Sequence, residues 1–486
     1  MNPEFFLLVW AIGLLIFEAC RSPEKDPRLI GQLAMVGIAL TLAATWLVPA
    51  PEGLSWKLMY QSDPLAIFFK RLFLVVAFFV AWMSLDDSKR FPLSRGEFFI
   101  FPLFTTVGLM LLASAADMIV IFVALELVTI SFYVLVAFQR DRTESLEAGV
   151  KYLIIGGLST AFLVYGLAFL YGGVESLSFT GISSYLVTNP VNSWILFGMV
   201  LVLIGIGFKL AAVPFHAWAP DVYQGAPTPV TAFLATGSKA AAVLVLVRLF
   251  TEAGAIFRDD RLVPIFGPIF AGLAIASMVL GSLAALPQRN LKRLLGYSSI
   301  GHAGFILVGF SCYSDAGNAA VLMYLGVYVL SALLAFFIMA RLSSELGGDD
   351  IQNYAGLGRR SPLMALGLAV AFVSMAGLPP LAGFLGKLGV LGAAWLARDY
   401  ILFGVVVFCA VAALYYYLNI VRAMYWQDGP SQAKPVSVNP SFRLGVIALI
   451  LLVIGLGFYP LPLSEAVEQA IPGSRGGQVL AETIQP

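Results

Sequence analysis

Long apolar runs recur along almost the whole chain and are separated by short polar segments. A membrane-spanning helix needs about 20 mostly apolar residues. The run at 362–398 is long and interrupted, and we interpret it as one broken helix. The pattern then predicts about fourteen spans, at residues 4–20, 29–49, 65–85, 97–115, 117–138, 148–171, 193–213, 229–252, 265–286, 294–312, 317–342, 362–398, 401–426 and 442–460.

The distribution of Lys and Arg supports this number of spans. Eighteen of the 29 Lys and Arg residues lie in one set of alternating loops, and six lie in the other set. Cytoplasmic loops of membrane proteins carry an excess of these residues. The sequence therefore predicts that both termini are outside. Dividing 362–398 into two spans would exchange the two sides after it and weaken the bias.

Composition excludes several classes of protein. Of the 486 residues, 60% are hydrophobic and 12% are charged, which excludes a soluble enzyme of several domains. The net charge of +1 argues against nucleic acid as a partner. Cys20, Cys312 and Cys409 are far apart, so a disulfide framework and iron–sulfur ligation are not expected. Glycine-rich nucleotide motifs are absent from the sequence. We expect an all-α polytopic membrane protein with no cofactor of its own and no metal site.

Ionisable side chains lie deep inside four of the apolar runs, where a charge costs roughly 2.5–3.5 kcal/mol on insertion scales. Glu126 and Lys239 lie about ten residues into their runs, and Lys387 lies nine residues past Leu378 in the interrupted run, or roughly 14 Å along a helix. Lys209 comes just before an interruption at Pro214. One carboxylate cannot pair with three lysines, and a desolvated lysine can exchange protons near neutrality. We expect a proton relay; the alternative is a static buried ion pair.

Two histidines and two further cations are weaker candidates. His302 lies inside its run and His216 lies beside an interruption. Histidine can pass protons near neutrality, but each could equally be a hydrogen-bonded packing residue. Lys70 and Arg71 lie about two turns into their run. We expect these two side chains to extend along the helix to the membrane interface.

Two runs are interrupted by Pro and Gly, at 212–216 and at 376–383. Irregular backbone at membrane depth is tolerated where it lines a buried or watered cavity, and broken helices in two halves indicate inverted repeats. The interruptions are five spans apart, so each is the fourth helix of a five-helix group. Because five is odd, the second group is inverted relative to the first. The predicted divisions are a three-helix segment at 1–96, repeats at 97–252 and 265–426, and a last span with a short polar tail at 427–486.

Four segments carry a resemblance to a known family. The longest is PFHAWAPDVYQGAPTPVTAFL at 214–234, and LKRLLGYSSIGHAGF follows at 291–305. EAGVKY at 147–152 and GLPPLAGF at 377–384 match as well. Together they resemble the antiporter-like subunits of proton-pumping NADH–quinone oxidoreductase, respiratory complex I, from about residue 60 to 425. That family has fourteen spans with inverted five-helix repeats, in which helices 7 and 12 are broken.

The resemblance implies roles for individual residues. Glu126 matches the fifth-helix glutamate and Lys209 the seventh-helix lysine, which form a switchable ion pair in the family. Lys239 matches the eighth-helix lysine, the central proton carrier. Lys387 matches the twelfth-helix lysine, a relay toward the exit, and His302 falls among polar residues of the proton path.

The resemblance also implies an assembly in a bacterial plasma (inner) membrane, with both termini on the periplasmic side. The chain would translocate protons, while NADH oxidation and quinone reduction take place in partner subunits that hold FMN and iron–sulfur clusters. Its neighbours would be L- and M-type subunits, a small K-type subunit and the lipid bilayer. The chain past Tyr459 contains several prolines and is too short for the lateral helix of the L-type branch. Residues 214–234 favour the N-type branch over the M-type.

Two rival interpretations stay open. A Mrp-type sodium/proton antiporter or a membrane-hydrogenase subunit is built on the same repeats, and sodium-dependent transport without a quinone reductase would favour it. A purely structural membrane anchor gives no reason for three deeply placed lysines.

Overall fold

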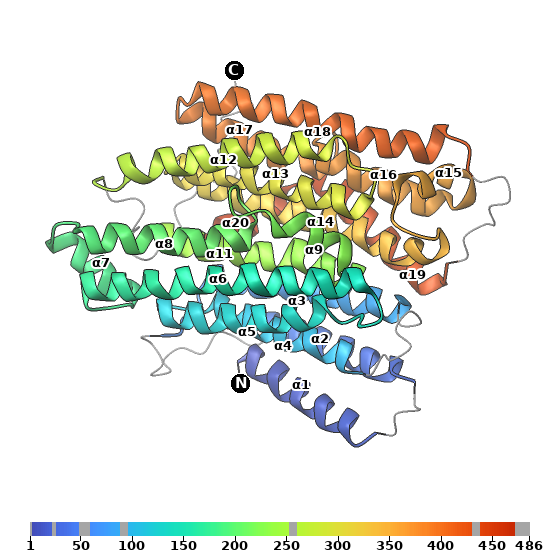
Figure 1. Cartoon of the computed structure of the whole chain (residues 1–486), viewed down its shortest axis with the longest axis horizontal. Coiled ribbons are helices and arrows are strands. Elements are labelled where there is room, and N and C mark those ends of the chain that lie inside the picture. The colour runs from blue at the N-terminus through green and yellow to red at the C-terminus, as the bar shows by residue number, and fades with distance from the viewer. Residues whose placement is uncertain are drawn as a thin grey trace. The chain divides into compact units, whose positions relative to one another are not determined.

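The protein is helical throughout the part that the structure describes. The computed structural model describes residues 2–21, 26–47, 59–87, 96–251, 260–429 and 438–471 (Figure 1). Within these ranges, β pairing is limited to three isolated bridges. The predicted all-α class is confirmed. The predicted polar tail past residue 471 lies outside the described residues.

The chain divides into two compact units, Met1–Ala211 with Gly225–Phe266, and Ala212–Gln224 with Gly267–Pro486. The helices of the first unit are α1 (Pro3–Ala19), α2 (Arg28–Leu47), α3 (Pro64–Asp87), α4 (Glu97–Ala113), α5 (Met118–Val136), α6 (Thr143–Val174), α7 (Phe179–Thr188), α8 (Ser193–Leu210), α10 (Thr228–Phe233) and α11 (Lys239–Thr251). The helices of the second are α9 (Trp218–Gly225), α12 (Val263–Ala285), α13 (Leu291–Ser311), α14 (Asp315–Glu345), α15 (Leu357–Arg360), α16 (Pro362–Ala376), α17 (Ala382–Leu396), α18 (Tyr400–Trp426), α19 (Pro440–Phe458) and α20 (Leu461–Ala470). The outermost residues of α9 and α12 extend into the first unit.

Many of these helices can cross a membrane. In the described residues, 11 helices are long and apolar enough to span one, and α4, α16 and α17 are shorter apolar helices. Their bounds agree closely with the predicted runs: α14, for example, covers Asp315–Glu345 where the sequence predicts 317–342. The short helices α7, α9, α15 and α20 were not predicted.

Both predicted interruptions are present. α8 ends at Leu210, Ala211 adopts a left-handed conformation with φ of 59°, and a cis peptide bond joins Val213 to Pro214 before α9 begins. α16 ends at Ala376, Gly377 has φ of 85°, and a second cis peptide bond joins Pro379 to Pro380 before α17 begins. The helix ends on either side of each interruption leave backbone groups without intrahelical partners.

The helix that carries Lys239 contains an irregular turn. A π-helical turn, Leu234–Ser238, joins α10 to α11, and the span Thr228–Thr251 is entirely buried. π-helical turns are rare and are frequent at functional sites. The apolar pattern of the sequence does not reveal this turn, because it changes the backbone without changing the hydrophobicity.

The helix α9 packs inside the second unit. Arg293 of α13 binds Asp221 of α9, with Nη1 2.5 Å from Oδ1, and the Tyr223 hydroxyl lies 3.0 Å from Ser299 Oγ. A Cβ on Gly296 would lie 2.9 Å from the Pro220 backbone, so α13 and α9 are in close contact. In the same unit, α14 is buried over most of its length and packs against α13, α16, α17 and α19.

Candidate functional site

The first unit holds three of the predicted site residues, Glu126, Lys209 and Lys239. Glu126 is half-buried on α5, and its Oε1 accepts a hydrogen bond from Thr160 Oγ1 of α6 at 2.7 Å. Lys209 is buried at the last turn of α8. Its amine donates to the hydroxyl of Thr129 on α5.

Glu126 and Lys209 are therefore close but not paired. Thr129 lies one helical turn after Glu126 on α5, and no ion pair within 4.0 Å joins Glu126 to Lys209 in the described coordinates. The Thr129 hydroxyl donates to the Leu125 carbonyl at 2.6 Å, which leaves its oxygen free to accept from the lysine. The ion pair that the family resemblance implied is not formed in this structure, because each charge is held by a threonine hydroxyl.

Aromatic rings surround the Lys209 amine. The amine lies 5.6 Å from the centroid of the Phe208 ring, and Tyr152 stacks on Phe208 with centroids 6.0 Å apart. Tyr133 packs edge-on against Tyr152 at 5.3 Å. The Tyr133 hydroxyl is buried and has no hydrogen-bond partner among the residues described. Buried polar groups usually have a partner, often an ordered water. This hydroxyl is therefore suited to binding a water, and Tyr133 lies two helical turns after Glu126 on α5.

Lys239 lies directly after the π-helical turn and is only 2% exposed. It is the first residue of α11, inside a span that is buried along its whole length. The neighbouring Thr236 donates to the Ala232 carbonyl at 2.6 Å, so its hydroxyl hydrogen is used within the irregular turn. The prediction that Lys239 is deeply buried is confirmed.

Lys70 has a partner that the sequence did not predict. The side chain is 2% exposed, and its Nζ lies 3.3 Å from Glu4 Oε1, in the first turn of α1, and 3.0 Å from the hydroxyl of Tyr60, which precedes α3. A buried carboxylate from α1 compensates the charge, so the side chain has no need to reach water. Arg71 differs, because it is partly exposed and donates to the Thr45 carbonyl at 3.0 Å near the end of α2.

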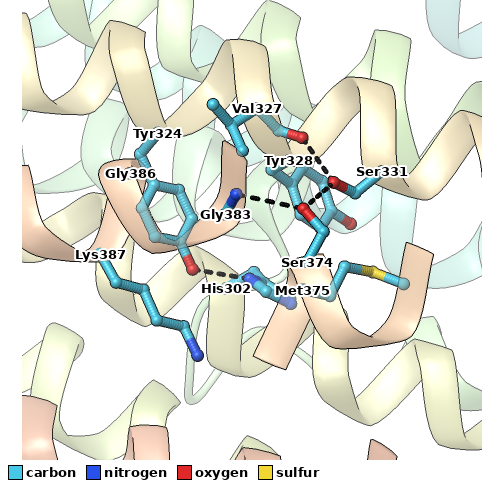
Figure 2. Close-up of a pocket in the computed structure, with 10 residues that line it drawn as sticks. All are labelled: His302, Tyr324, Val327, Tyr328, Ser331, Ser374, Met375, Gly383, Gly386 and Lys387. Carbon is cyan, nitrogen blue, oxygen red and sulfur yellow. Dashed lines mark hydrogen bonds between the residues drawn. The ribbon is translucent and has the colours of Figure 1, made fainter. Parts of the chain in front are cut away.

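The second unit holds His216, His302 and Lys387. His302 is buried on α13, and Figure 2 shows its hydrogen bond with the Tyr324 hydroxyl. Its Nδ1 lies 2.6 Å from the Tyr324 hydroxyl and its Nε2 lies 3.2 Å from the Tyr417 hydroxyl. A neutral imidazole donates through one nitrogen and accepts through the other. The ring can therefore receive a proton on one side and release one on the other.

Lys387 uses a backbone group that the helix interruption leaves free. Its Nζ donates to the carbonyl of Ala376, the last residue of α16, at 2.7 Å, and lies 5.0 Å from the centroid of the Phe305 ring. A Cβ on Gly377 would lie 2.6 Å from Lys387 Cδ, so the glycine makes room for the lysine. In the described structure no carboxylate lies within 4.0 Å of this amine. Among the described residues, the hydrogen-bond partners of Lys209 and Lys387 are a hydroxyl and a carbonyl.

A small cavity lies between Lys387 and His302 (Figure 2). The space open to the centre of a water molecule is about 10 Å³, which is about enough for one water. Ser374 Oγ lies 2.8 Å from Ser331 Oγ and accepts from Gly383 N at 3.1 Å. The cavity is lined by His302, Tyr324, Val327, Tyr328, Ser331, Ser374, Met375, Gly383, Gly386 and Lys387.

Two serine hydroxyls on α13 bind tyrosines that lie against His302. The Tyr417 hydroxyl contacts Ser298 Oγ, and the Tyr328 hydroxyl donates to Ser299 Oγ at 3.3 Å. Sequence reasoning missed these tyrosines. Their signal is a hydroxyl-bearing aromatic near the middle of an apolar run, as at Tyr324 and Tyr328 in 317–342.

His216 lies in the connection that follows α8 and precedes α9 along the chain, beside the first interruption, and is half-buried. No group of three or more His, Cys, Asp or Glu residues that could hold a metal ion is found in the residues searched, which are the described ones.

Comparisons with known proteins agree on one family. The family model described as "NADH:quinone oxidoreductase/Mrp antiporter, TM" matches residues 115–412. NADH-quinone oxidoreductase subunit N of Moorella thermoacetica is 39% identical over 455 residues, which cover 93% of each chain. A chain in the structure of respiratory complex I from Thermus thermophilus is 32% identical, with a TM-score of 0.79 over 96% of this chain and 99% of that one. A chain of the Mrp complex from a Dietzia species has the same fold, with a TM-score of 0.84 over 99% of this chain and 98% of that one at 18% identity.

Proposed function

Because this chain belongs to the NADH:quinone oxidoreductase/Mrp antiporter family, we propose that it is the N-type antiporter-like subunit of an NADH–quinone oxidoreductase. In this proposal it lies in the membrane arm and translocates protons. Oxidation of NADH and reduction of quinone take place in partner subunits, which hold the FMN and the iron–sulfur clusters. The enzyme activity belongs to the assembly, and this chain contributes the proton pathway.

The observation that carries the proposal is the environment of Lys387. Its amine binds a carbonyl freed by a broken helix and borders a cavity with room for about one water, with the His302 imidazole lining the same cavity. Such a lysine is charged without a fixed counter-ion, so its protonation can change at moderate cost. Proton transfer from the Lys387 amine through a water to His302, and from His302 to a tyrosine hydroxyl, needs only short rearrangements of hydrogen bonds.

In the first unit we assign the switching step to Lys209. The amine has two acceptors on α5, the Thr129 hydroxyl that it binds and the Glu126 carboxylate one turn away. When Lys209 binds Thr129, Glu126 is held by Thr160 alone. When Lys209 moves to Glu126, the ion pair forms and the positive charge shifts along α5. A charge at membrane depth interacts strongly with other buried charges, so this shift is able to alter the protonation of Lys239.

The finer architecture belongs to the same proposal. We propose fourteen spans, with inverted repeats over 97–252 and 265–426 that follow the three-helix segment 1–96 and precede the last span and tail at 427–486. The two interruptions, which both end in short irregular segments before a new helix, support this arrangement. The bias of Lys and Arg supports periplasmic termini in a bacterial inner membrane. The immediate partners are the homologous L- and M-type subunits and the small K-type subunit.

A purification tests the assignment. The tagged chain is extracted with a gentle detergent, and the co-purifying material is assayed for NADH-dependent quinone reduction. We expect activity together with flavin and iron–sulfur spectra. A preparation that holds only antiporter-like partners and transports sodium without redox activity would instead identify a Mrp-type transporter. This outcome is included because a chain of the Mrp complex has the same fold.

A further inference from the structure

A second group of buried charges lies in the first unit, apart from Glu126, Lys209 and Lys239. Glu4 of α1 is 1% exposed and Lys70 of α3 is 2% exposed. The Lys70 amine lies 3.3 Å from Glu4 Oε1 and 3.0 Å from the Tyr60 hydroxyl, and that hydroxyl donates to the same Glu4 oxygen. The three groups form a closed triangle of an acid, a base and a hydroxyl between them. We call it the Glu4–Tyr60–Lys70 triad.

The backbone holds Tyr60 in place. Tyr60 forms an isolated bridge with Ala115, in the connection between α4 and α5. Gln61 N donates to Ser114 O at 2.8 Å, and Ala116 N donates to Met59 O at 3.0 Å. The tyrosine hydroxyl is therefore directed at Glu4 by backbone hydrogen bonds on both sides.

A second ion pair connects the triad to the helix of Lys239. Arg248 of α11 binds both carboxylate oxygens of Asp63, at 2.6 and 2.7 Å, and donates to the Ala113 carbonyl at 2.6 Å. Lys70 interacts electrostatically with both Asp63 and Arg248. Arg248 comes nine residues after Lys239, which is roughly 14 Å along a helix. α11 thus extends from the central lysine to this group of charges.

The triad and the Asp63–Arg248 ion pair together include fully buried and partly exposed side chains. The Arg248 side chain is 1% exposed, whereas the Asp63 side chain is 29% exposed and Tyr60 is half-buried. The second carboxylate oxygen of Glu4, Oε2, is buried and has no hydrogen-bond partner in the described part of the chain. An ionised carboxylate is costly to leave in this state. Binding a proton, or a water, at this oxygen removes that cost.

We propose that the Glu4–Tyr60–Lys70 triad is a proton-holding site through which the first unit releases protons. The inference rests on the proposed function and on its prediction that the termini are outside. In the transfer step, Lys70 gives a proton to the Tyr60 oxygen while the Tyr60 hydroxyl proton passes to Glu4. The ammonium becomes a neutral amine, the carboxylate becomes a neutral acid, and the tyrosine is unchanged. Glu4 then gives its proton to a water that reaches its buried Oε2, and Lys70 takes one from the interior.

The arrangement of charges favours transfer over a static role. Glu4, Lys70, Asp63 and Arg248 sum to zero charge, and they still sum to zero after the proton has moved from Lys70 to Glu4. The step therefore neutralises one buried pair without creating an uncompensated charge, which would be costly. Asp63 and Arg248 stay ionised, and they hold α11 against the end of α4 while the triad changes state.

The test uses the complete complex in inverted membrane vesicles, with the initial rate of proton uptake divided by the rate of NADH oxidation. Tyr60→Phe removes the bridging hydroxyl and keeps the ring. The double variant Glu4→Gln with Lys70→Met removes both charges together. We expect each to lower this ratio by up to the share of the protons that this one antiporter-like subunit translocates, and to change its pH profile. Arg71→Met is the matched control, because Arg71 is adjacent to Lys70 and, among the described residues, binds the end of α2.

The outcomes separate this inference from the function on which it rests. Normal ratios and an unchanged pH profile in assembled Tyr60→Phe and double-variant complexes overturn the inference, even if the complexes melt earlier. Lys239→Met is measured beside them. If Lys239→Met is impaired while the triad variants pump normally, only the triad role fails. If all of them pump normally, the proposed proton pathway fails as well.

Discussion

Lys209 binds Thr129 and not Glu126, although both acceptors lie on α5 one helical turn apart. A lysine with two alternative acceptors on one helix has two positions of similar geometry and different charge balance. In the Thr129 position the carboxylate and the ammonium are both uncompensated by an ion pair. In the Glu126 position they neutralise each other. In the function proposed above, this arrangement is one end point of a two-position switch.

Removing the Thr129 hydroxyl should lock the switch. In Thr129→Val the lysine loses its hydroxyl acceptor while the side-chain shape is kept, so the amine should stay with Glu126. We expect proton uptake per NADH in inverted vesicles to fall by up to the share of the protons that this one subunit translocates. Ser131→Ala is the matched control, because Ser131 lies on the same helix and donates only to the Leu127 carbonyl at 2.8 Å. Equal losses in both variants would contradict the switch.

Gly377 should be required for the position of Lys387. A Cβ there would lie 2.6 Å from Lys387 Cδ, and φ of 85° is strained for alanine. The backbone strain alone costs about 1–2 kcal/mol. Gly377→Ala should lower both proton uptake per NADH and the melting temperature of the purified complex. Gly389→Ala on α17 is the control, because its Cβ would meet only Ala320 at 3.6 Å. Normal pumping in Gly377→Ala would argue against the role of Lys387.

Two tyrosines of α14 that lie against His302, Tyr324 and Tyr328, should not be equivalent. Tyr324 contacts His302 Nδ1, whereas Tyr328 presents its ring to His302 at 4.7 Å and its hydroxyl to Ser299. We therefore expect Tyr324→Phe to reduce proton uptake per NADH more than Tyr328→Phe does. Each variant keeps its aromatic ring and loses only the hydroxyl, so the two effects can be compared directly. If Tyr328→Phe is the more damaging change, the proton path runs through Ser299 and not through Tyr324.

The buried ion pair of Asp63 with Arg248 should contribute strongly to stability. In Asp63→Asn the buried guanidinium loses this carboxylate. Breaking a fully buried pair costs about 3–5 kcal/mol, and this pair should cost less because the Asp63 side chain is 29% exposed. We expect a clearly lower melting temperature by differential scanning fluorimetry. Asp428→Asn is the control, because its pair with Arg359 has side chains that are 92% and 84% exposed. Exposed pairs contribute about 0–1 kcal/mol, so that variant should melt like the parent protein.

The sequence predicts the helices well and their side-chain partners poorly. Apolar runs of about 20 residues are a local property, so the bounds of α14 and both interruptions follow directly from them. The partner of Lys70 is 66 positions away on α1, and no local pattern indicates it. The hydrogen bond between His302 and Tyr417 spans 115 positions in the same way. The π-helical turn before Lys239 also escapes prediction, because it depends on backbone geometry within a uniformly buried span.

The placement of α9 affects how the protein is made. Residues 212–224 belong to the second unit, although the chain on both sides of them belongs to the first. During synthesis α9 leaves the ribosome before any of α13, whose Arg293 and Ser299 bind it. The first half of the chain must therefore enter the membrane with one helix still lacking its neighbours. Separate expression of the two halves, divided between α11 and α12, would leave α9 on the wrong fragment, so the halves should not mature independently.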